Sequence, residues 1–277
     1  MIFYETIYGR DLMHLEKLTE EIEEWLEKAD EEETLRFLGR TIPDNTEGII
    51  ILELLGYYGA VAQTVTKELQ TLSQKSLKLA GAFSSYFNEM IQLIDEDILL
   101  PISLVQVKIG SNRFILTTSS FAIPDVISYQ LADELWSFYL KLNPSRIIII
   151  DGVHNFRRDA SSVPQVHQVN SSKSGVEFKE NIDSDFTMMG QAASSFLTYY
   201  SNVENIPIEL LTVDSFADYD PVSALELLKV FTHDFKIEHD FSNLLKEVSS
   251  FKDTFQASKE RIPEDKSILH TDSQFFV

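Results

Sequence analysis

The sequence contains no cysteine, which excludes disulfides, thiolate metal ligands and cysteine nucleophiles together. Glycine and proline are sparse, at 10 and 8 of 277 residues, and this argues against a long disordered or collagen-like chain. Apolar runs such as residues 48–55 are short, and none approaches the roughly 18 residues of a membrane-spanning helix. The N-terminus has no basic segment followed by an apolar run, so we expect no signal peptide and a soluble, intracellular protein.

Basic residues are also few. The chain has 23 lysines and arginines against 44 aspartates and glutamates, a net charge of −21. Such a chain repels phosphate backbones and anionic lipid surfaces, so we expect no nucleic-acid partner and no membrane partner. Two interpretations of the acidity stay open: it keeps the protein soluble, or it steers a basic partner toward it.

Common catalytic and metal-binding motifs are absent from the sequence. It has no GxSxG nucleophile elbow and no GxxxxGK[ST] phosphate loop. The histidines form neither an HExxH motif nor an i, i+4 pair, so their spacing supports no metal site. We therefore expect no metal and no cofactor. The histidines are His14, His154, His167, His233, His239 and His270.

The apolar pattern predicts an α/β fold. Residues 48–55 form a β-branched run after a glycine and are expected to be a buried strand, although Glu53 within it favours a position at a sheet edge or interface. A glycine turn and a helix with apolar residues at spacing four follow this strand. Similar alternation downstream predicts a mixed, mainly parallel sheet with helices on both faces. The further expected elements are strands at 80–87, 104–109, 113–118, 146–150 and 208–213, and helices at 124–142, 187–200, 221–231 and 237–255.

Composition divides the chain into three parts. Residues 1–45 are expected to be an acidic helical extension, whose amphipathic helix at 11–28 either lies solvated on the domain or binds a partner. Residues 46–262 are expected to form a single α/β domain with a polar insertion loop at about 157–184. Pro263 should end the last helix, which leaves 263–277 as a flexible tail.

The ends of three expected strands offer a candidate site, because open α/β sheets bind ligands beyond the carboxyl ends of their strands. These ends carry 56–59, 151–154 and 214–215. Asp151 and His154 could act as an acid/base pair, and the turn from Gly56 to Gly59 could present backbone N–H groups to an anion. A purely structural role stays open for each, since Asp-Gly after a strand is ordinary turn chemistry.

Four segments carry a family resemblance. Residues 48–69 form a strand, glycine turn and helix; 114–153 hold a strand, a proline-started helix and a strand ending in Asp-Gly; 189–231 combine a small-residue stretch, an Ile-Pro strand and an Asp-Pro-started helix; and 237–255 form an acidic helix. In these features the chain resembles the proteasome assembly chaperones of the α ring. The C-terminal Phe275-Phe276-Val277 is similar to the family's tail of hydrophobic residue, tyrosine and any residue, with phenylalanine in place of the tyrosine.

The resemblance implies a Rossmann-like, phosphorylase-like domain with a non-catalytic function. It implies one subunit of a eukaryotic-type heterodimer that binds the proteasome α ring, inserts its tail between α subunits, promotes ring assembly and blocks premature docking of activators. No nucleotide is implied. The expected location is the cytoplasm, with the nucleus as a second compartment. The alternatives are a small-molecule hydrolase or phosphorylase-like enzyme that uses Gly56–Gly59 with Asp151 and His154, and an unrelated scaffold on the same core.

The tail has the chemistry that such docking needs. Phe275 and Phe276 supply apolar area for a pocket, and the carboxylate of Val277 can pair with a buried lysine or arginine. Residues 264–277 would reach on the order of 45 Å when extended. An alternative also stays open, in which these residues are simply a frayed chain end. If the tail docks, the contact at Phe276 should be mainly apolar.

Overall fold

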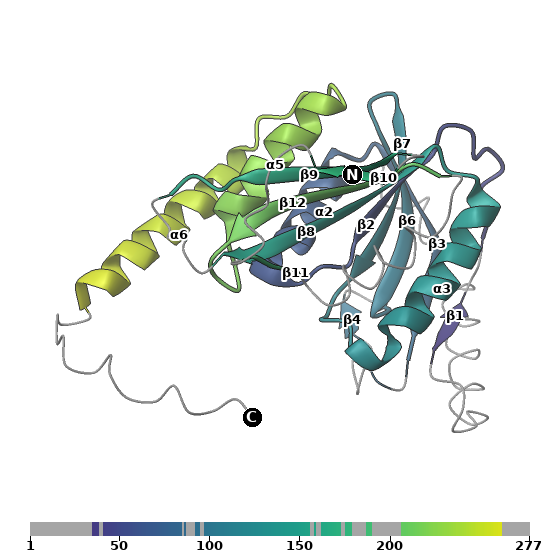
Figure 1. Ribbon diagram of the computed structural model, residues 1–277, viewed down its shortest axis with the longest axis horizontal. Coiled ribbons are helices and arrows are strands. Elements are labelled where there is room, and N and C mark those ends of the chain that lie inside the picture. The colour runs from purple at the N-terminus through teal and green to yellow at the C-terminus, as the bar shows by residue number, and fades with distance from the viewer. Residues whose placement is uncertain are drawn as a thin grey trace, which may run out of the picture.

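The computed structural model describes residues 35–38, 41–84, 86, 92–94, 97–155, 158, 162–172, 175–178, 187–189 and 206–261. Within these residues a ten-stranded sheet has the order β1-β3-β6-β7-β2-β8-β12-β9-β10, with β11 paired to β8, and β4 and β5 pair separately (Figure 1). The strands are β1 (Arg36–Leu38), β2 (Ile50–Leu54), β3 (Lys75–Phe83), β4 (Gln92–Ile94), β5 (Asp97–Leu99), β6 (Ile102–Ile109), β7 (Asn112–Ser119), β8 (Arg146–Asn155), β9 (Val166–Ser172), β10 (Gly175–Phe178), β11 (Thr187–Met189) and β12 (Ile208–Ser215). The helices are the 3-10 turn η1 (Tyr58–Ala60), α2 (Val61–Leu72), α3 (Asp125–Leu142), α5 (Pro221–Asp234) and α6 (Ser242–Arg261).

The centre of the sheet is parallel and its flanks are antiparallel. Strand β2 pairs in parallel with β7 and β8, and β8 pairs in parallel with β12. The β6–β7 hairpin and β3 extend one flank in antiparallel order, and β9 and β10 extend the other. The mixed α/β class is therefore confirmed, but parallel pairing is confined to the four central strands, so the sheet is less parallel than the sequence predicts.

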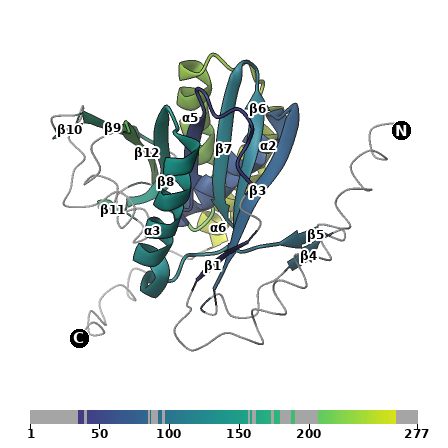
Figure 2. The same cartoon turned by 90° about the vertical axis from the view of Figure 1, so that its right-hand side faces the viewer.

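Helices cover both faces of the sheet, as expected (Figure 2). On one face α3 packs over odd-numbered β8 residues such as Ile147 and Ile149, and we call this the α3 face. On the other face α2, α5 and α6 pack over even-numbered residues such as Ile148 and Ile150, and we call this the α2 face. Because side chains of a strand alternate between faces, the parity of a residue number in β8 tells which layer its side chain enters.

The expected helix starts are confirmed at two prolines. Pro124 immediately precedes α3, and Asn143, which caps its C-terminus, lies in the left-handed region at φ 45°. Pro221 is the first residue of α5, and the Asp220 side chain accepts a hydrogen bond from the Ser223 backbone N–H at 3.1 Å. The fixed φ of proline and a capping carboxylate both favour a helix start at these positions.

The segment expected to be a polar insertion loop contains two strands. Strand β9 pairs with β12, where Glu209 opposes Asn170, and β10 pairs back onto β9. The local polarity of 157–184 is compatible with strands at the flank of the sheet, where backbone hydrogen bonds between strands supply the order that the side chains do not predict. The helix expected at 187–200 is wrong at its start, because residues 187–189 form β11, and 190–200 lie outside the described residues.

The last helix begins later than expected. It starts at Ser242 rather than at Ile237, after Lys236 and Phe241, which have φ values of 53° and 52°. The side chain of Asp240 accepts a hydrogen bond from the Ser242 backbone N–H at 3.0 Å. Apolar residues at helical spacing continue through the preceding loop, so the sequence pattern does not show where α6 starts.

The sheet also includes residues of the segment that was expected to be an N-terminal extension. Arg36 opposes Phe83 in the β1–β3 pairing, and Leu35 is buried in the core of the α3 face. The helix expected at 11–28 and the tail expected at 263–277 lie outside the described residues. None of the helices in the described part of the chain has both the length and the apolar character needed to cross a membrane.

Candidate functional site

The three predicted strand ends meet at the carboxyl edge of β2, β8 and β12. A Cβ atom on Gly56 would lie 1.8 Å from Oδ1 of Asp151, and one on Gly59 would lie 2.1 Å from Oγ of Ser215. A Cβ on Gly152 would lie 2.2 Å from the Tyr58 carbonyl oxygen. The glycine turn therefore lies directly against the ends of β8 and β12. A Cβ on Gly152 would meet the backbone of Tyr58, whereas one on Gly56 or Gly59 would meet the side chain of Asp151 or Ser215.

Asp151 is the most unusual group at this edge. Its side chain is buried, and neither carboxyl oxygen has a hydrogen-bond partner in the structure as described. Burial raises the pKa of Asp151 to about 8. A carboxyl group with this pKa is mostly protonated at pH 7.

Asp151 and His154 do not come together. Odd residues of β8 face α3, so Asp151 lies on the α3 face, whereas His154 shares the α2 face with Gly152. The ring of His154 lies 5.9 Å from the ring of Tyr58, measured between centroids. The predicted acid/base pair is wrong, because an odd separation along a continuous strand sends the two side chains to opposite layers.

The glycine turn uses its backbone groups within the protein. The N–H of Ala60 donates to the Tyr57 carbonyl at 3.2 Å, and the Gly59 carbonyl accepts from the Asp220 N–H at 2.8 Å. The Gly56 carbonyl accepts from the side-chain amide of Gln63 at 2.9 Å. These bonds close the turn and tie it to α2 and α5. Of the three, only the bond from Ala60 engages an N–H group of the turn that could otherwise bind an anion.

Asp214, at the end of β12, binds two polar side chains that the sequence does not predict as its partners. His167 Nε2 lies 3.2 Å from Asp214 Oδ1, and the side-chain amide of Asn155 donates to Oδ2 at 3.1 Å. Burial alone would raise the pKa of Asp214, but these two hydrogen bonds hold it below its ordinary value. His167 belongs to β9, inside the expected loop, and only the pairing of β9 with β12 brings it here.

A buried arginine joins this cluster. Nη1 of Arg158 contacts Oδ2 of Asp220 in an ion pair whose two side chains are 3% and 0% exposed. The same nitrogen donates to the Asp214 carbonyl and to Ser223 Oγ, each at 2.6 Å. The guanidinium also lies 5.1 Å from the ring centroid of Phe216. Arg158 thus links the end of β12 to the start of α5, and nothing in the local sequence around it indicates this role.

Glu53 lies at the centre of the sheet, so the expected edge position is wrong. Strand β2 runs between β7 and β8, and the Glu53 side chain is fully buried beneath α3. The hydroxyl of Tyr139 donates to Thr117 Oγ1 at 2.7 Å and lies 3.4 Å from Glu53 Oε2. Burial, and then the charge of Glu53, raise the pKa of Tyr139 well above its ordinary value.

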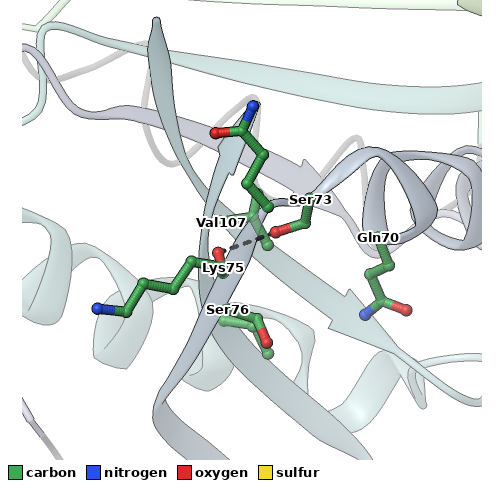
Figure 3. A pocket seen from close by; sticks show the side chains of 7 residues that line it. Gln70, Ser73, Lys75, Ser76 and Val107 are labelled. Atoms are coloured by element: carbon green, nitrogen blue, oxygen red, sulfur yellow. Dashed lines mark hydrogen bonds between the residues drawn. The ribbon is translucent and has the colours of Figure 1, made fainter. Parts of the chain in front are cut away.

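A pocket of about 590 Å³ lies away from this edge, where the end of α2 meets β3 and β6 (Figure 3). Its lining contains one lysine and no acid or histidine, so it holds no acid/base pair. The lining residues are Gln70, Ser73, Gln74, Lys75, Ser76, Val105 and Val107. Within the described ranges, no group of three histidine, aspartate or glutamate side chains is arranged to hold a metal ion.

The predicted partner-binding residues Phe275, Phe276 and Val277 lie outside the described residues. The structure therefore describes the path toward them only as far as Arg261, the last residue of α6. At the carboxyl edge of the sheet, the polar groups mostly bind one another. The arrangement is that of a mixed α/β domain in which Asp214, Arg158 and Asp220 bind one another, whereas both carboxyl oxygens of Asp151 lack a hydrogen-bond partner among the described residues.

Solved structures with a similar fold include archaeal and bacterial proteins. Pyrococcus furiosus PbaB, described as an archaeal proteasome activator, superimposes with a TM-score of 0.67 at 16% identity, over 82% of this chain and 99% of its own. Pyrococcus furiosus PbaA, described as an archaeal homolog of proteasome-assembly chaperone, gives 0.62 at 16% identity, over 84% and 99%. Mycobacterium tuberculosis Rv2125, described as a proteasome-assembly chaperone homologue, gives 0.59 at 15% identity, over 78% and 96%.

At such low identity these likenesses establish the fold alone. The family follows from the sequence, because residues 58–257 match the profile of the PAC2 family. This match covers more than half of the chain, and the chain belongs to the PAC2 family. A search of curated protein sequences gave no significant match.

Proposed function

We propose that this protein is a proteasome assembly chaperone that binds the α ring of the core particle. Membership of the PAC2 family over residues 58–257 carries the proposal. The descriptions of PbaA and Rv2125 as homologues of assembly chaperones, and of PbaB as a proteasome activator, support a partner of this kind. We further propose that it pairs with a related chaperone subunit and works in the cytoplasm and the nucleus.

The proposed contact is the C-terminal tail. Phe275 and Phe276 would enter an apolar pocket between α subunits, and the terminal carboxylate of Val277 would pair with a basic side chain there. The net charge of −21 would speed the encounter with a basic pocket rim. A tail seated between subunits would favour ring assembly and occupy the position that a premature activator needs.

The carboxyl edge of the sheet supports a function without catalysis. The acid/base pair on which the enzyme alternative depends is divided between the two faces of β8. Asp151 lies against Gly56, and the turn above it is closed by its own hydrogen bonds. These contacts hold the strand ends together, which is a structural task.

The test is a binding titration of purified α-ring intermediates with three versions of the full chain and one shortened chain. Deletion of 274–277 and the substitution Phe276→Asp should each weaken binding, because the pocket would lose apolar area or receive a charge. Phe276→Tyr is the matched control and should bind like the unaltered chain. Equal affinities for all four proteins would refute tail docking, and stimulated peptide hydrolysis by mature core particles would indicate an activator instead.

A further inference from the structure

Four aromatic side chains hold α6 against the end of the sheet. Phe216 and Tyr219 lie in the loop between β12 and α5, and Phe251 and Phe255 lie on α6. The ring centroid of Phe216 is 5.9 Å from that of Phe251 and 5.4 Å from that of Phe255. Tyr219 meets Phe251 edge-on at 6.3 Å. We call these four residues the aromatic clamp.

The clamp lies where α6 leaves the hydrophobic core. Leu244 and Val248 in the first half of the helix are buried in the core of the α2 face. Phe251 and Phe255 continue the same stripe but are half-buried, and residues 252–254 around them are exposed. Figure 1 shows the second half of α6 extending past the sheet. Because an exposed helix end has little intrinsic stability, the clamp is the main described contact that supports this half.

The clamp rests on a rigid base. Arg158 lies over the ring of Phe216, and the same guanidinium is bound to Asp220, the capping residue of α5. Asp220 Oδ2 also accepts from the Phe216 backbone N–H at 3.4 Å. The loop that carries Phe216 is therefore fixed by a buried ion pair, so it can define the direction of a helix that packs on it.

A polar contact on the neighbouring side of α6 adds to the clamp. The Tyr219 hydroxyl donates to Glu247 Oε2 at 2.7 Å, and Lys67 of α2 donates to Glu247 Oε1 at 2.6 Å. The hydrogen bonds from Lys67 and Tyr219 hold the pKa of Glu247 below its ordinary value. Glu247 thus ties α6 both to α2 and to the clamp loop.

We propose that the aromatic clamp is a positioning device that fixes the direction of α6 and hence the point from which the C-terminal tail leaves the domain. This inference rests on the proposed docking of the tail. A helix rises about 1.5 Å per residue, so the stretch from Phe251 to Arg261 spans about 15 Å, and a tilt of about 10° at the clamp would move the end of α6 by about 3 Å. The tail and the domain would then contact the α ring as two linked binding elements. If the tail leaves the domain at a fixed point, its effective concentration at its pocket is higher once the domain is bound.

The test is a cycle of four proteins in the α-ring titration: the full chain, Phe255→Ala, the chain without 274–277, and the combination. In the full chain Phe255→Ala should weaken binding by about threefold or more, since a linked tail can contribute 10²- to 10⁴-fold. In the shortened chain the same substitution should change nothing. Leu245→Ala is the matched control, because Leu245 lies on α6 but is 48% exposed.

A second measurement follows the helix itself. The chain has no cysteine, so Ser137→Cys on α3 and Ala257→Cys on α6, both at exposed positions, would carry spin labels only there. Phe255→Ala should broaden the distance distribution between the labels, and Phe255→Tyr should restore a narrow one. An unchanged distribution overturns the inference even if binding changes.

The outcomes separate the two proposals. Unchanged affinity on removal of 274–277 would overturn tail docking, and the positioning role with it. If removal of 274–277 lowers the affinity but Phe255→Ala in the full chain does not, the positioning role alone is overturned. If Phe255→Ala lowers the affinity equally with and without 274–277, the positioning role is also overturned, because the clamp would then contact the partner directly.

Discussion

The buried carboxyl of Asp151 should make the stability of this protein depend on pH in an unusual direction. Its pKa is about 8 in the folded state, against an ordinary value of 3.8. Between these values the folded protein holds a proton that the unfolded chain releases. Stability from this group is therefore full below the unfolded pKa, falls as pH rises, and levels off above the folded pKa.

The magnitude follows from that interval. Each unit of difference corresponds to about 1.4 kcal/mol, so the span from 3.8 to about 8 amounts to on the order of 6 kcal/mol. Most of it is lost by pH 7. Asp151→Asn keeps the shape that lies against Gly56 and removes the proton equilibrium. The variant should match the unaltered protein only below the unfolded pKa of 3.8, exceed it by about 1–2 kcal/mol at pH 5, and exceed it by several kcal/mol at pH 8.

Guanidinium unfolding at pH 5, 6, 7 and 8 would measure this difference, with Trp136 as a buried fluorescent reporter. Other titrating groups are common to both proteins, so they cancel in the difference between them. Asp253→Asn, at an exposed position on α6, is the control and should show no such trend. A difference between Asp151→Asn and the unaltered protein that stays constant from pH 5 to pH 8 would refute the reasoning.

Three further substitutions test the contacts around this edge by chemical unfolding. Gly56→Ala should destabilise by about 1–3 kcal/mol, because its Cβ would lie 1.8 Å from Asp151 Oδ1, and no loss would contradict that contact. Arg158→Ala should cost about 3–5 kcal/mol, because it leaves Asp220 buried without its cation, and a loss below about 1 kcal/mol would speak against the ion pair. Tyr139→Phe should cost about 1–2 kcal/mol through the lost bond to Thr117, and an unchanged midpoint would count against it.

Much of the central fold could be predicted from local sequence. The run at 48–55 is β-branched and apolar apart from Glu53, which is typical of a strand buried on both faces, and it contains the central strand β2. Gly110 lies at φ 58° in the expected hairpin between β6 and β7, and Pro124 and Pro221 mark the helix starts. In each case the residues themselves restrict the backbone, so the signal is local.

The predictions were wrong where the structure of a segment depends on residues far away in the sequence. Strand β9 has a polar sequence and acquires its structure from pairing with β12. Glu53 is accommodated at the centre of the sheet with the help of Tyr139, which lies 86 residues away in sequence. At the candidate site the grouping of three strand ends could be predicted from fold class, but the separation of Asp151 from His154 required the strand to continue past Ile150. Period-two alternation then places them in different layers.

The contacts of Asp220 affect how this protein unfolds locally. Its backbone N–H bonds to the Gly59 carbonyl, and its carboxylate caps α5, binds Arg158 and accepts from Phe216. One residue thus joins the glycine turn, the start of α5 and the loop under α6. Segments joined in this way open together rather than singly, so their amide hydrogens should exchange with solvent at a common free energy. The strand ends and the part of α6 that packs on Phe216 then form a single cooperative unit, although they lie far apart in the sequence.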